Sequence, residues 1–186
     1  MAGTDVRLID ALNNPALRAI AEQGQVRTYA KHSVIINEGD HGDTVFLILS
    51  GLVKIYAVGS EGKEVALNFL GPGELVGELA MDGEPRTASV MTLEPTACVA
   101  ISRVQLQDTI RANPNFALQL ISMLIKRTRR ATKEVKRLAL ESVYARITAL
   151  LEEDSIVRGD QRMLPYKLTQ QELASRVGAS REMVNR

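Results

Sequence analysis

Glycine is distributed unevenly along this chain of 186 residues, and the distribution limits what the chain can fold into. Nine of the thirteen glycines lie between Gly39 and Gly83, and none follows until Gly159. Within the glycine-rich part, short apolar runs alternate with turn residues at intervals of about 8–12 residues, which is typical of antiparallel sandwiches and barrels. The glycines therefore predict a β domain that is confined to the first part of the chain.

The apolar runs predict the strands of this domain. They cover residues 34–36, 45–49, 52–58, 65–70, 87–93 and 97–101. Before Ala30 apolar residues recur at helical spacing instead, so short helices are expected around Leu8, Leu12, Leu17 and Ile20. We expect an α+β protein in which residues 1–113 form a jelly-roll-like β-barrel and helices follow.

The composition is that of a globular protein, with 45% apolar and 24% charged residues. No stretch approaches the roughly 18 apolar residues of a membrane span, and no export signal is visible at the N-terminus. Cys98 is the single cysteine, which excludes an internal disulfide and a cysteine-ligated iron–sulfur cluster within the chain. We therefore expect a cytoplasmic protein without a membrane partner.

From Pro114 the apolar period becomes helical. Apolar and small residues step alternately by four and three, which is typical of a helix that pairs with a second copy of itself. The positions of this seam are Ala117, Ile121, Leu124, Thr128, Ala131, Val135 and Leu138. We expect a homodimer formed through a helix over residues 114–141. The alternative is a long helix that packs only on its own β domain.

Residues 142–186 are predicted to form a helix-turn-helix. Thr169 and Glu172 have the spacing of a capping box, so a helix begins there. Ala174 allows two helices to cross closely, Gly178 can take the positive φ of a tight turn, and Val184 can anchor the second helix. The alternative is an ordinary helical hairpin with exposed charges.

The second helix of this motif is expected to begin after Ser180 and to enter the major groove of DNA. Arginines there can pair with guanine, and a glutamate can accept from cytosine. Residues at the start of the supporting helix are placed for phosphate contacts. The predicted DNA contacts are Thr169, Gln170, Ser180, Arg181, Glu182 and Arg186. A recognition helix needs about three turns, so we expect the motif to be truncated at Arg186.

Between Gly71 and Val90 the residue types suit a phosphodiester. Arg86 offers a forked cation and Thr87 a hydroxyl, while a short helix beginning at residues 77–80 would direct backbone N–H groups toward an anion. Glu78 could accept a hydrogen bond from a sugar hydroxyl. The alternative is a hairpin that contains a structural Arg–Glu pair.

These motifs together resemble one family. Gly39-Asp40, Gly51, residues 61–64, residues 77–80 and residues 86–88 are similar to cyclic-nucleotide-binding domains. With the long helix and the C-terminal motif, the chain resembles the cyclic AMP receptor protein (CRP/FNR) family of bacterial transcription regulators. The resemblance implies a homodimer in which a cyclic nucleotide, and no cofactor, controls a winged helix-turn-helix. It also implies palindromic double-stranded DNA and RNA polymerase as partners.

The resemblance also implies which residues contact the ligand: Gly77, Glu78, Leu79, Ala80, Arg86, Thr87 and Thr132. Two departures concern the ligand. Ala131 stands where the family has a hydroxyl residue near the adenine, and the segment from Glu78 to Arg86 is shorter than usual. Cyclic AMP is the first choice because the charged pair is present, and cyclic GMP and cyclic di-GMP remain alternatives.

Other classes of function have weaker support. A metal-dependent β-barrel enzyme or a haem-based gas sensor would need histidine ligands, and His32 and His41 are the only histidines. Both are flanked by turn or charged residues and are predicted to lie on the surface. A nucleotide-binding module that never contacts DNA is disfavoured by the helix-turn-helix pattern.

The net charge of +1 conceals an asymmetry. Residues 1–113 contain nine Lys and Arg against fourteen Asp and Glu, a net of −5, and residues 114–186 contain fourteen against eight, a net of +6. The basic part is expected to face the phosphate backbone of DNA, where such charge supplies most of the affinity. The acidic part can still bind one small anion through a local arginine.

Overall fold

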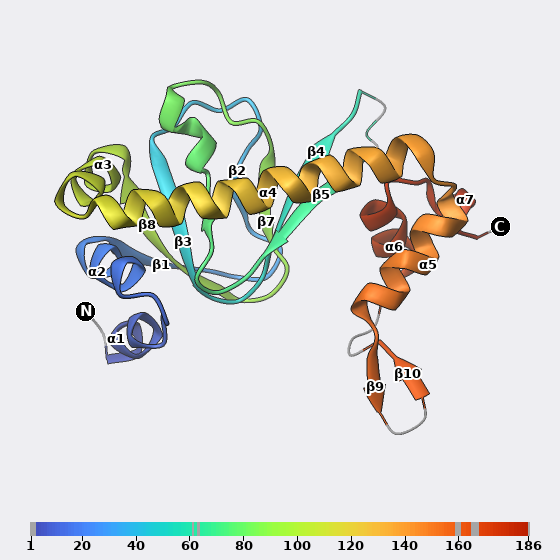
Figure 1. Cartoon of the computed structure of the whole chain (residues 1–186), viewed down its shortest axis with the longest axis horizontal. Coiled ribbons are helices and arrows are strands. Elements are labelled where there is room, and N and C mark those ends of the chain that lie inside the picture. Colours follow the sequence, from blue (N-terminus) through green and yellow to red (C-terminus); the bar gives the residue numbers. More distant parts are fainter. Residues whose placement is uncertain (1–2, 61, 63, 159–160, 165–167, 186) are drawn as a thin grey trace. The chain divides into compact units, whose positions relative to one another are not determined.

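The chain divides into two compact units in a computed structural model (Figure 1). The first unit contains residues 1–57 and 67–123, and the second contains residues 58–66 and 124–186. The structure describes residues 3–60, 62, 64–158, 161–164 and 168–185. Within this described part of the chain, no helix is long and apolar enough to cross a membrane.

Two four-stranded sheets form the framework of the β domain, with strand orders β1-β8-β3-β6 and β2-β7-β4-β5. The strands whose register is described pair antiparallel. Their bounds are β1 Gln25–Tyr29, β2 Val34–Ile36, β3 Thr44–Ser50, β4 Val53–Val58, β5 Glu64–Leu70, β6 Leu75–Val76, β7 Ser89–Thr92 and β8 Thr96–Ser102. The predicted jelly-roll-like β domain is therefore present.

Strand β3 explains how the core is organised, because it is buried on both of its faces. Phe46 and Ile48 pack in a core cluster shared with residues of the second sheet, such as Val53. Val45 and Leu47 belong to a second cluster, on the side covered by helices. A strand buried on both faces has a continuous apolar sequence rather than an alternating one, as residues 45–49 do.

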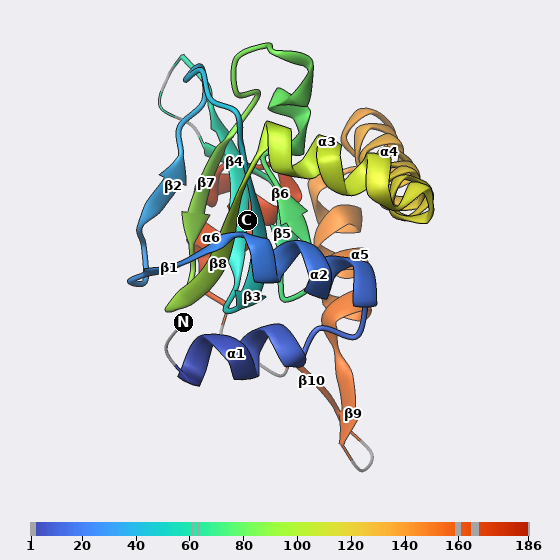
Figure 2. The same ribbon diagram turned by 90° about the vertical axis from the view of Figure 1, so that its left-hand side faces the viewer.

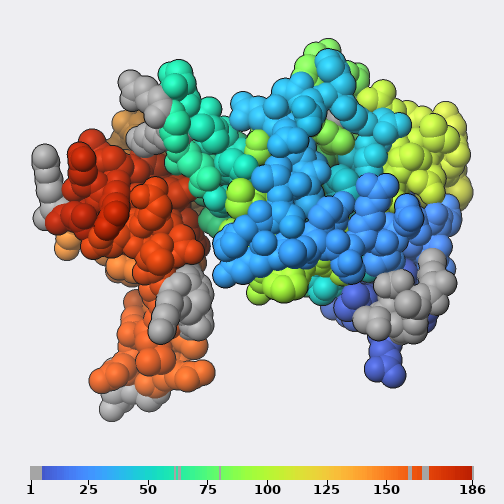
Figure 3. Space-filling view, turned by 180° about the vertical axis from the view of Figure 1, so that it is seen from behind, coloured from blue at the N-terminus to red at the C-terminus, as the bar shows by residue number. Residues whose placement is uncertain are grey.

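The helices of the first unit are α1 Gly3–Asp10, α2 Pro15–Gln23, α3 Arg103–Ala112 and the beginning of α4 Pro114–Leu140. They cover the outer face of the β1-β8-β3-β6 sheet (Figure 2), where Ile20, Leu106 and Phe116 are fully buried. Figure 3 shows this unit from the side opposite to that of Figure 1. The blue N-terminal part of the chain covers much of this side. Cys98 is also fully buried, and burial raises the pKa of its thiol to about 12.

The expectation of helices throughout the region before Ala30 is wrong for Gln25–Tyr29, which form the edge strand β1. This strand pairs with β8, for example Val26 with Val99. Polar residues surround its single valine, so no apolar period was visible. The distant partner strand, rather than local propensity, decides its conformation.

The second unit contains the rest of α4, then α5 Val143–Asp154, β9 Ile156–Arg158, β10 Gln161–Met163, α6 Gln170–Val177 and α7 Arg181–Val184. The charged sequence over residues 152–162 predicts a loop, and the described residues of this segment differ from that prediction in part. Helix α5 continues to Asp154, and β9 and β10 then form an antiparallel pair. All described residues of this pair are exposed, so backbone hydrogen bonding rather than apolar burial defines it.

Candidate functional site

A pocket of about 370 Å³, partly open to solvent, lies in the first unit. Strands β2, β4, β6 and β7 supply an apolar wall, and the turn and 3-10 helix (η1, Glu78–Asp82) after β6 supply a polar side. The lining residues are Ile36, Ile55, Val76, Gly77, Glu78, Leu79, Arg86, Thr87, Ala88 and Val90. Such a pocket can hold a ligand that has one flat apolar end and one charged end.

Arg86 is held in place by backbone carbonyl groups. Its Nη1 donates to the carbonyl oxygen of Gly77 and its Nη2 donates to that of Thr44, each at 2.7 Å. The backbone N–H of Arg86 donates to the carbonyl of Asp40 at 2.9 Å, and its own carbonyl accepts from Gly39 at 2.8 Å. The residue is only 9% exposed. The guanidinium is therefore oriented by the protein itself.

Gly77 is needed where β6 turns toward this arginine. Its φ is +84°, and a Cβ atom there would lie 2.7 Å from Nη1 of Arg86 and 3.0 Å from Cδ1 of Ile36. A side chain would therefore collide with the group that it has to orient, in a backbone conformation that L residues rarely adopt.

Burial is the main influence on the charge of Arg86, and it lowers the pKa of the guanidinium from its usual value. Three carboxylates raise this pKa and so oppose the burial effect: Asp43, Glu78 and Asp40. Arginine stays protonated at neutral pH in such surroundings. The pocket therefore offers a fixed cation, a hydroxyl from Thr87 and a carboxylate acceptor from Glu78.

The structure brings five of the seven predicted ligand residues into this pocket: Gly77, Glu78, Leu79, Arg86 and Thr87. Ala80 belongs to the 3-10 helix that follows Gly77. Thr132 lies on α4 in the second unit, where its hydroxyl donates to the carbonyl of Thr128 at 2.9 Å. The roles of all seven as ligand contacts stay predictions.

Sequence reasoning missed the apolar wall of the pocket and the backbone acceptors of Arg86. The wall consists of Ile36, Ile55, Val76, Ala88 and Val90. The predicted strands contained most of these residues, but their common position depends on how strands from distant segments pair. The carbonyl of Thr44 belongs to the backbone, so the residue type gives no indication of its role. Only the folded structure shows that it accepts from Arg86.

The helix-turn-helix has the local geometry that the sequence predicted. The Thr169 hydroxyl accepts from the Glu172 backbone, and the Glu172 carboxylate accepts from the Thr169 backbone. Gly178 is left-handed, with φ +63° and ψ 39°. A Cβ atom at Gly178 would lie 2.7 Å from Cδ2 of Leu138, so this turn packs closely on the end of α4. Ala174 is buried at the inner face.

The predicted DNA contacts in the described part of this motif are at its surface. Thr169, Gln170, Arg181 and Glu182 are exposed. The Ser180 hydroxyl instead caps α7 by accepting from the backbone N–H of Met183 at 3.2 Å. Arg186 lies outside the described residues. Whether these residues contact DNA stays a prediction.

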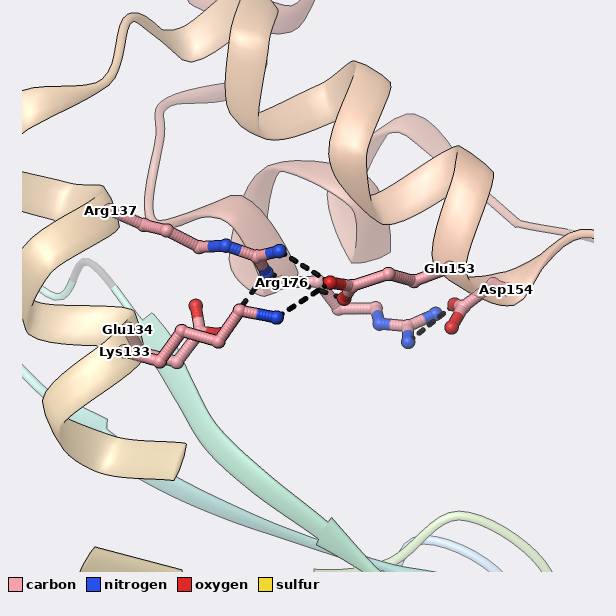
Figure 4. A network of polar contacts seen from close by, with 6 residues as sticks. All are labelled: Lys133, Glu134, Arg137, Glu153, Asp154 and Arg176. Atoms are coloured by element: carbon pink, nitrogen blue, oxygen red, sulfur yellow. Dashed lines mark hydrogen bonds and ion pairs between the residues drawn. The ribbon is translucent and has the colours of Figure 1, made fainter. Parts of the chain in front are cut away.

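An ion-pair network joins α4, α5 and α6 within the second unit (Figure 4). Glu153 accepts from Arg137 and from Lys133, the latter at 2.9 Å, and Asp154 pairs with Arg176 at 2.6 Å. Hydrogen bonds from Arg137 and Lys133 lower the pKa of Glu153 to about 2. The two adjacent carboxylates at the end of α5 therefore face cations from both neighbouring helices.

Comparison with known proteins decides the family. The model of the cyclic nucleotide-binding domain matches residues 26–113. A CRP-like cAMP-activated global transcriptional regulator of Mycobacterium tuberculosis is 32% identical over 176 residues, covering 92% of this chain and 79% of that protein. This chain belongs to the CRP/FNR family of transcriptional regulators. The family resemblance seen in the sequence is therefore confirmed.

Other CRP/FNR relatives support the same assignment. The cAMP-activated global transcriptional regulator CRP of Salmonella typhimurium is 29% identical over 180 residues, covering 93% of this chain and 85% of that protein. The solved structure of CLP from Xanthomonas campestris, described as a c-di-GMP responsive global regulator, has a TM-score of 0.81 and 26% identity. It covers 91% of this chain and 87% of that one. These relatives are transcriptional regulators, not enzymes, as predicted.

Proposed function

We propose that this CRP/FNR protein is a homodimeric transcription regulator whose binding to a palindromic operator is controlled by a cyclic nucleotide. The preset guanidinium of Arg86 at the polar end of the pocket carries this proposal. A phosphodiester anion pairs with such a fork through charge-assisted hydrogen bonds, which are about twice as strong as neutral ones. RNA polymerase is the expected protein partner, as the family resemblance implies.

The nucleotide lies with its phosphate at Arg86 and Thr87 and its ribose at Glu78, which accepts a hydrogen bond from a sugar hydroxyl. The base contacts the apolar wall, which includes Ile55 and Val90. Ala80 adds a backbone contact, and Thr132 contacts the base in the dimer. Burial of the base against this wall supplies much of the affinity.

Cyclic AMP is the effector that we propose. Two relatives, from Mycobacterium tuberculosis and Salmonella typhimurium, are named as cAMP-activated. Cyclic di-GMP is the second candidate because the CLP structure is described as c-di-GMP responsive. Cyclic GMP is the third, since Thr87 can also bond to guanine.

The exposed seam of α4 supports the dimer. Ile121 is 51% exposed, Leu124 37% and Val135 66%, whereas Phe116, which lies outside the seam, is fully buried. An apolar stripe along a helix of 27 residues is stabilised when a second copy of the helix covers it. The remaining seam positions are Ala117, Thr128, Ala131 and Leu138.

The DNA contacts that we propose follow from the exposed start of α7. Arg181, with Arg186, pairs with guanine and Glu182 accepts from cytosine, while Thr169, Gln170 and Ser180 contact phosphates. In the dimer, nucleotide binding favours the helix pairing that sets two α7 helices about 34 Å apart, one helical turn of DNA. The basic second part of the chain supplies the non-specific attraction.

The test is a DNA-binding titration with and without nucleotide. Fluorescence anisotropy of palindromic duplexes selected from a random pool is measured with the full chain, in buffer alone and with cyclic AMP, cyclic GMP or cyclic di-GMP. We expect cyclic AMP to tighten binding at least about tenfold, which corresponds to about 1.4 kcal/mol of coupling. Selected DNA that binds equally well with and without all three nucleotides would contradict the proposal.

A further inference from the structure

The loop of residues 40–44 wraps closely around Arg86. The Asp40 carbonyl accepts from the Arg86 backbone, and the Thr44 carbonyl accepts from its Nη2. Between them, a Cβ atom at Gly42 would lie 3.1 Å from the same Nη2. Asp43 stands between Gly42 and Thr44, so the backbone of both aspartates lies close to Arg86.

The charges around the phosphate position are unequal in number. Among the described residues of the pocket lining, Arg86 is the one cation, and Glu78 lies in the same lining. Asp40 and Asp43 add two exposed carboxylates. All three carboxylates raise the pKa of Arg86. The Asp40 carboxylate also accepts from Asn37 at 3.1 Å, which holds it in the loop. In the described part of the chain, an anion at Arg86 therefore pairs with one positive group that is itself influenced by three negative groups.

Part of the hydrogen-bonding capacity of Arg86 is already used by the protein. Of the five N–H donors of a guanidinium, one on each Nη is already directed to a backbone carbonyl. Three N–H donors therefore remain, which is enough for the two free oxygens of a phosphodiester. A phosphomonoester carries a charge of about −1.5 to −2 at pH 7, against −1 for a diester.

We propose that Asp40 and Asp43 are specificity-determining residues that favour the singly charged cyclic phosphodiester over the 5′-monophosphate of the same nucleoside. This inference rests on the proposed function, because it assumes that a cyclic nucleotide occupies the Arg86 pocket. Each carboxylate repels the doubly charged monoester more strongly than the singly charged diester. Exposed charge pairs change an equilibrium constant by about twofold to fivefold, so the two aspartates together change the preference by about tenfold.

The test compares the dissociation constants of cyclic AMP and 5′-AMP by calorimetry. The proteins are the parent chain, Asp43→Asn, Asp40→Asn and the double variant, at pH 7.5 and low salt. Glu94→Gln is the matched control, since Glu94 is an exposed carboxylate of the same unit and is outside the pocket lining. Thermal melting confirms that each variant is folded.

We expect the ratio of the 5′-AMP to the cyclic AMP dissociation constant to fall about threefold in each single variant and about tenfold in the double variant. The control keeps the parent ratio, and salt at about 0.5 M reduces the effect because it screens exposed charges. An unchanged ratio in the double variant, or an equal change in Glu94→Gln, overturns this inference but not the proposed function. Failure of the parent to bind either nucleotide overturns both.

Discussion

Arg137 of α4 and Glu153 of α5 form a two-point ion pair, in which both Nη atoms of the arginine donate to the carboxylate. Lys133, one turn earlier on α4, donates to the same carboxylate at 2.9 Å. The end of α5 is thereby tied to the helix that carries the predicted dimer seam. Since α6 is joined to the neighbouring Asp154 through Arg176, the network connects α4, α5 and α6 within the second unit.

The pairing makes the stability of the second unit depend on pH. The pKa of Glu153 is lowered from 4.5 to about 2 in the folded protein, so its contribution is complete above about pH 4.5 and is lost as the pH falls through 2. Because the Glu153 side chain is 46% exposed, we expect about 1 kcal/mol rather than the full value of the shift. Urea unfolding of the parent and Glu153→Gln should differ by this amount at pH 6.

The control is Glu152→Gln, an exposed neighbour for which the structure describes no ion pair. It should leave the free energy of unfolding unchanged within about 0.5 kcal/mol. The difference between the parent and Glu153→Gln should shrink steadily below pH 4.5. A difference that stays constant down to pH 2 would show that the pair contributes nothing in solution.

Gly77→Ala should abolish nucleotide binding. A Cβ atom there would lie 2.7 Å from Nη1 of Arg86, and the positive φ costs about 1 kcal/mol or more for alanine. Gly73→Ala is a matched control, because Gly73 has φ +83° but a Cβ atom there would meet nothing within 4 Å. Both variants should unfold at lower temperature, but only Gly77→Ala should lose binding in calorimetry. Equal affinities in the two variants would be inconsistent with the placement of Arg86.

The sequence was sufficient for features that depend on local chemistry. The Thr169 and Glu172 capping box, the left-handed Gly178 and the continuous apolar strand over residues 45–49 all occur as predicted. Each depends on a few neighbouring residues or on the total burial of one strand.

Features that depend on distant pairing could not be predicted. The edge strand Gln25–Tyr29 requires β8 as its partner, and the exposed pair of β9 and β10 has no apolar period. The carbonyl acceptors of Arg86 come from Gly77 and Thr44, which are 9 and 42 residues away in the sequence. Leu138 was assigned to the dimer seam, yet it also contacts the turn at Gly178.

Val135→Asp should dissociate the proposed dimer. Val135 is 66% exposed at a seam position, and an aspartate there would place two charges against each other in the paired helices. Leu140→Asp is the matched control, since Leu140 is 74% exposed on α4 and lies outside the seam. Sedimentation should give the mass of one chain for Val135→Asp and of two chains for the control. A dimer that persists in Val135→Asp would exclude the seam as the interface.

Arg181→Ala should weaken operator binding by roughly 1–3 kcal/mol and relax the preference at one base pair. Gln170→Ala should instead weaken binding to all sequences equally, because the proposed contact is to phosphate. Both are measured by anisotropy on an operator and on its single-base variants. An equal loss on every duplex for Arg181→Ala would make Arg181 a phosphate contact.

Calorimetric titration of the full chain with cyclic AMP, cyclic GMP and cyclic di-GMP tests the central claim most directly, with Arg86→Leu and Arg86→Lys as variants. Arg86 also donates to two backbone carbonyls, so its replacement affects stability as well as binding. Thermal melting therefore identifies which variants are folded before binding is compared. We predict one cyclic AMP bound per chain, with weaker binding of the other two nucleotides. We also predict a loss of at least about a hundredfold in Arg86→Leu, about 2.7 kcal/mol, with a smaller loss in Arg86→Lys. Binding of cyclic AMP to folded Arg86→Leu with the parent affinity, or no cyclic nucleotide binding by the parent, would contradict the account.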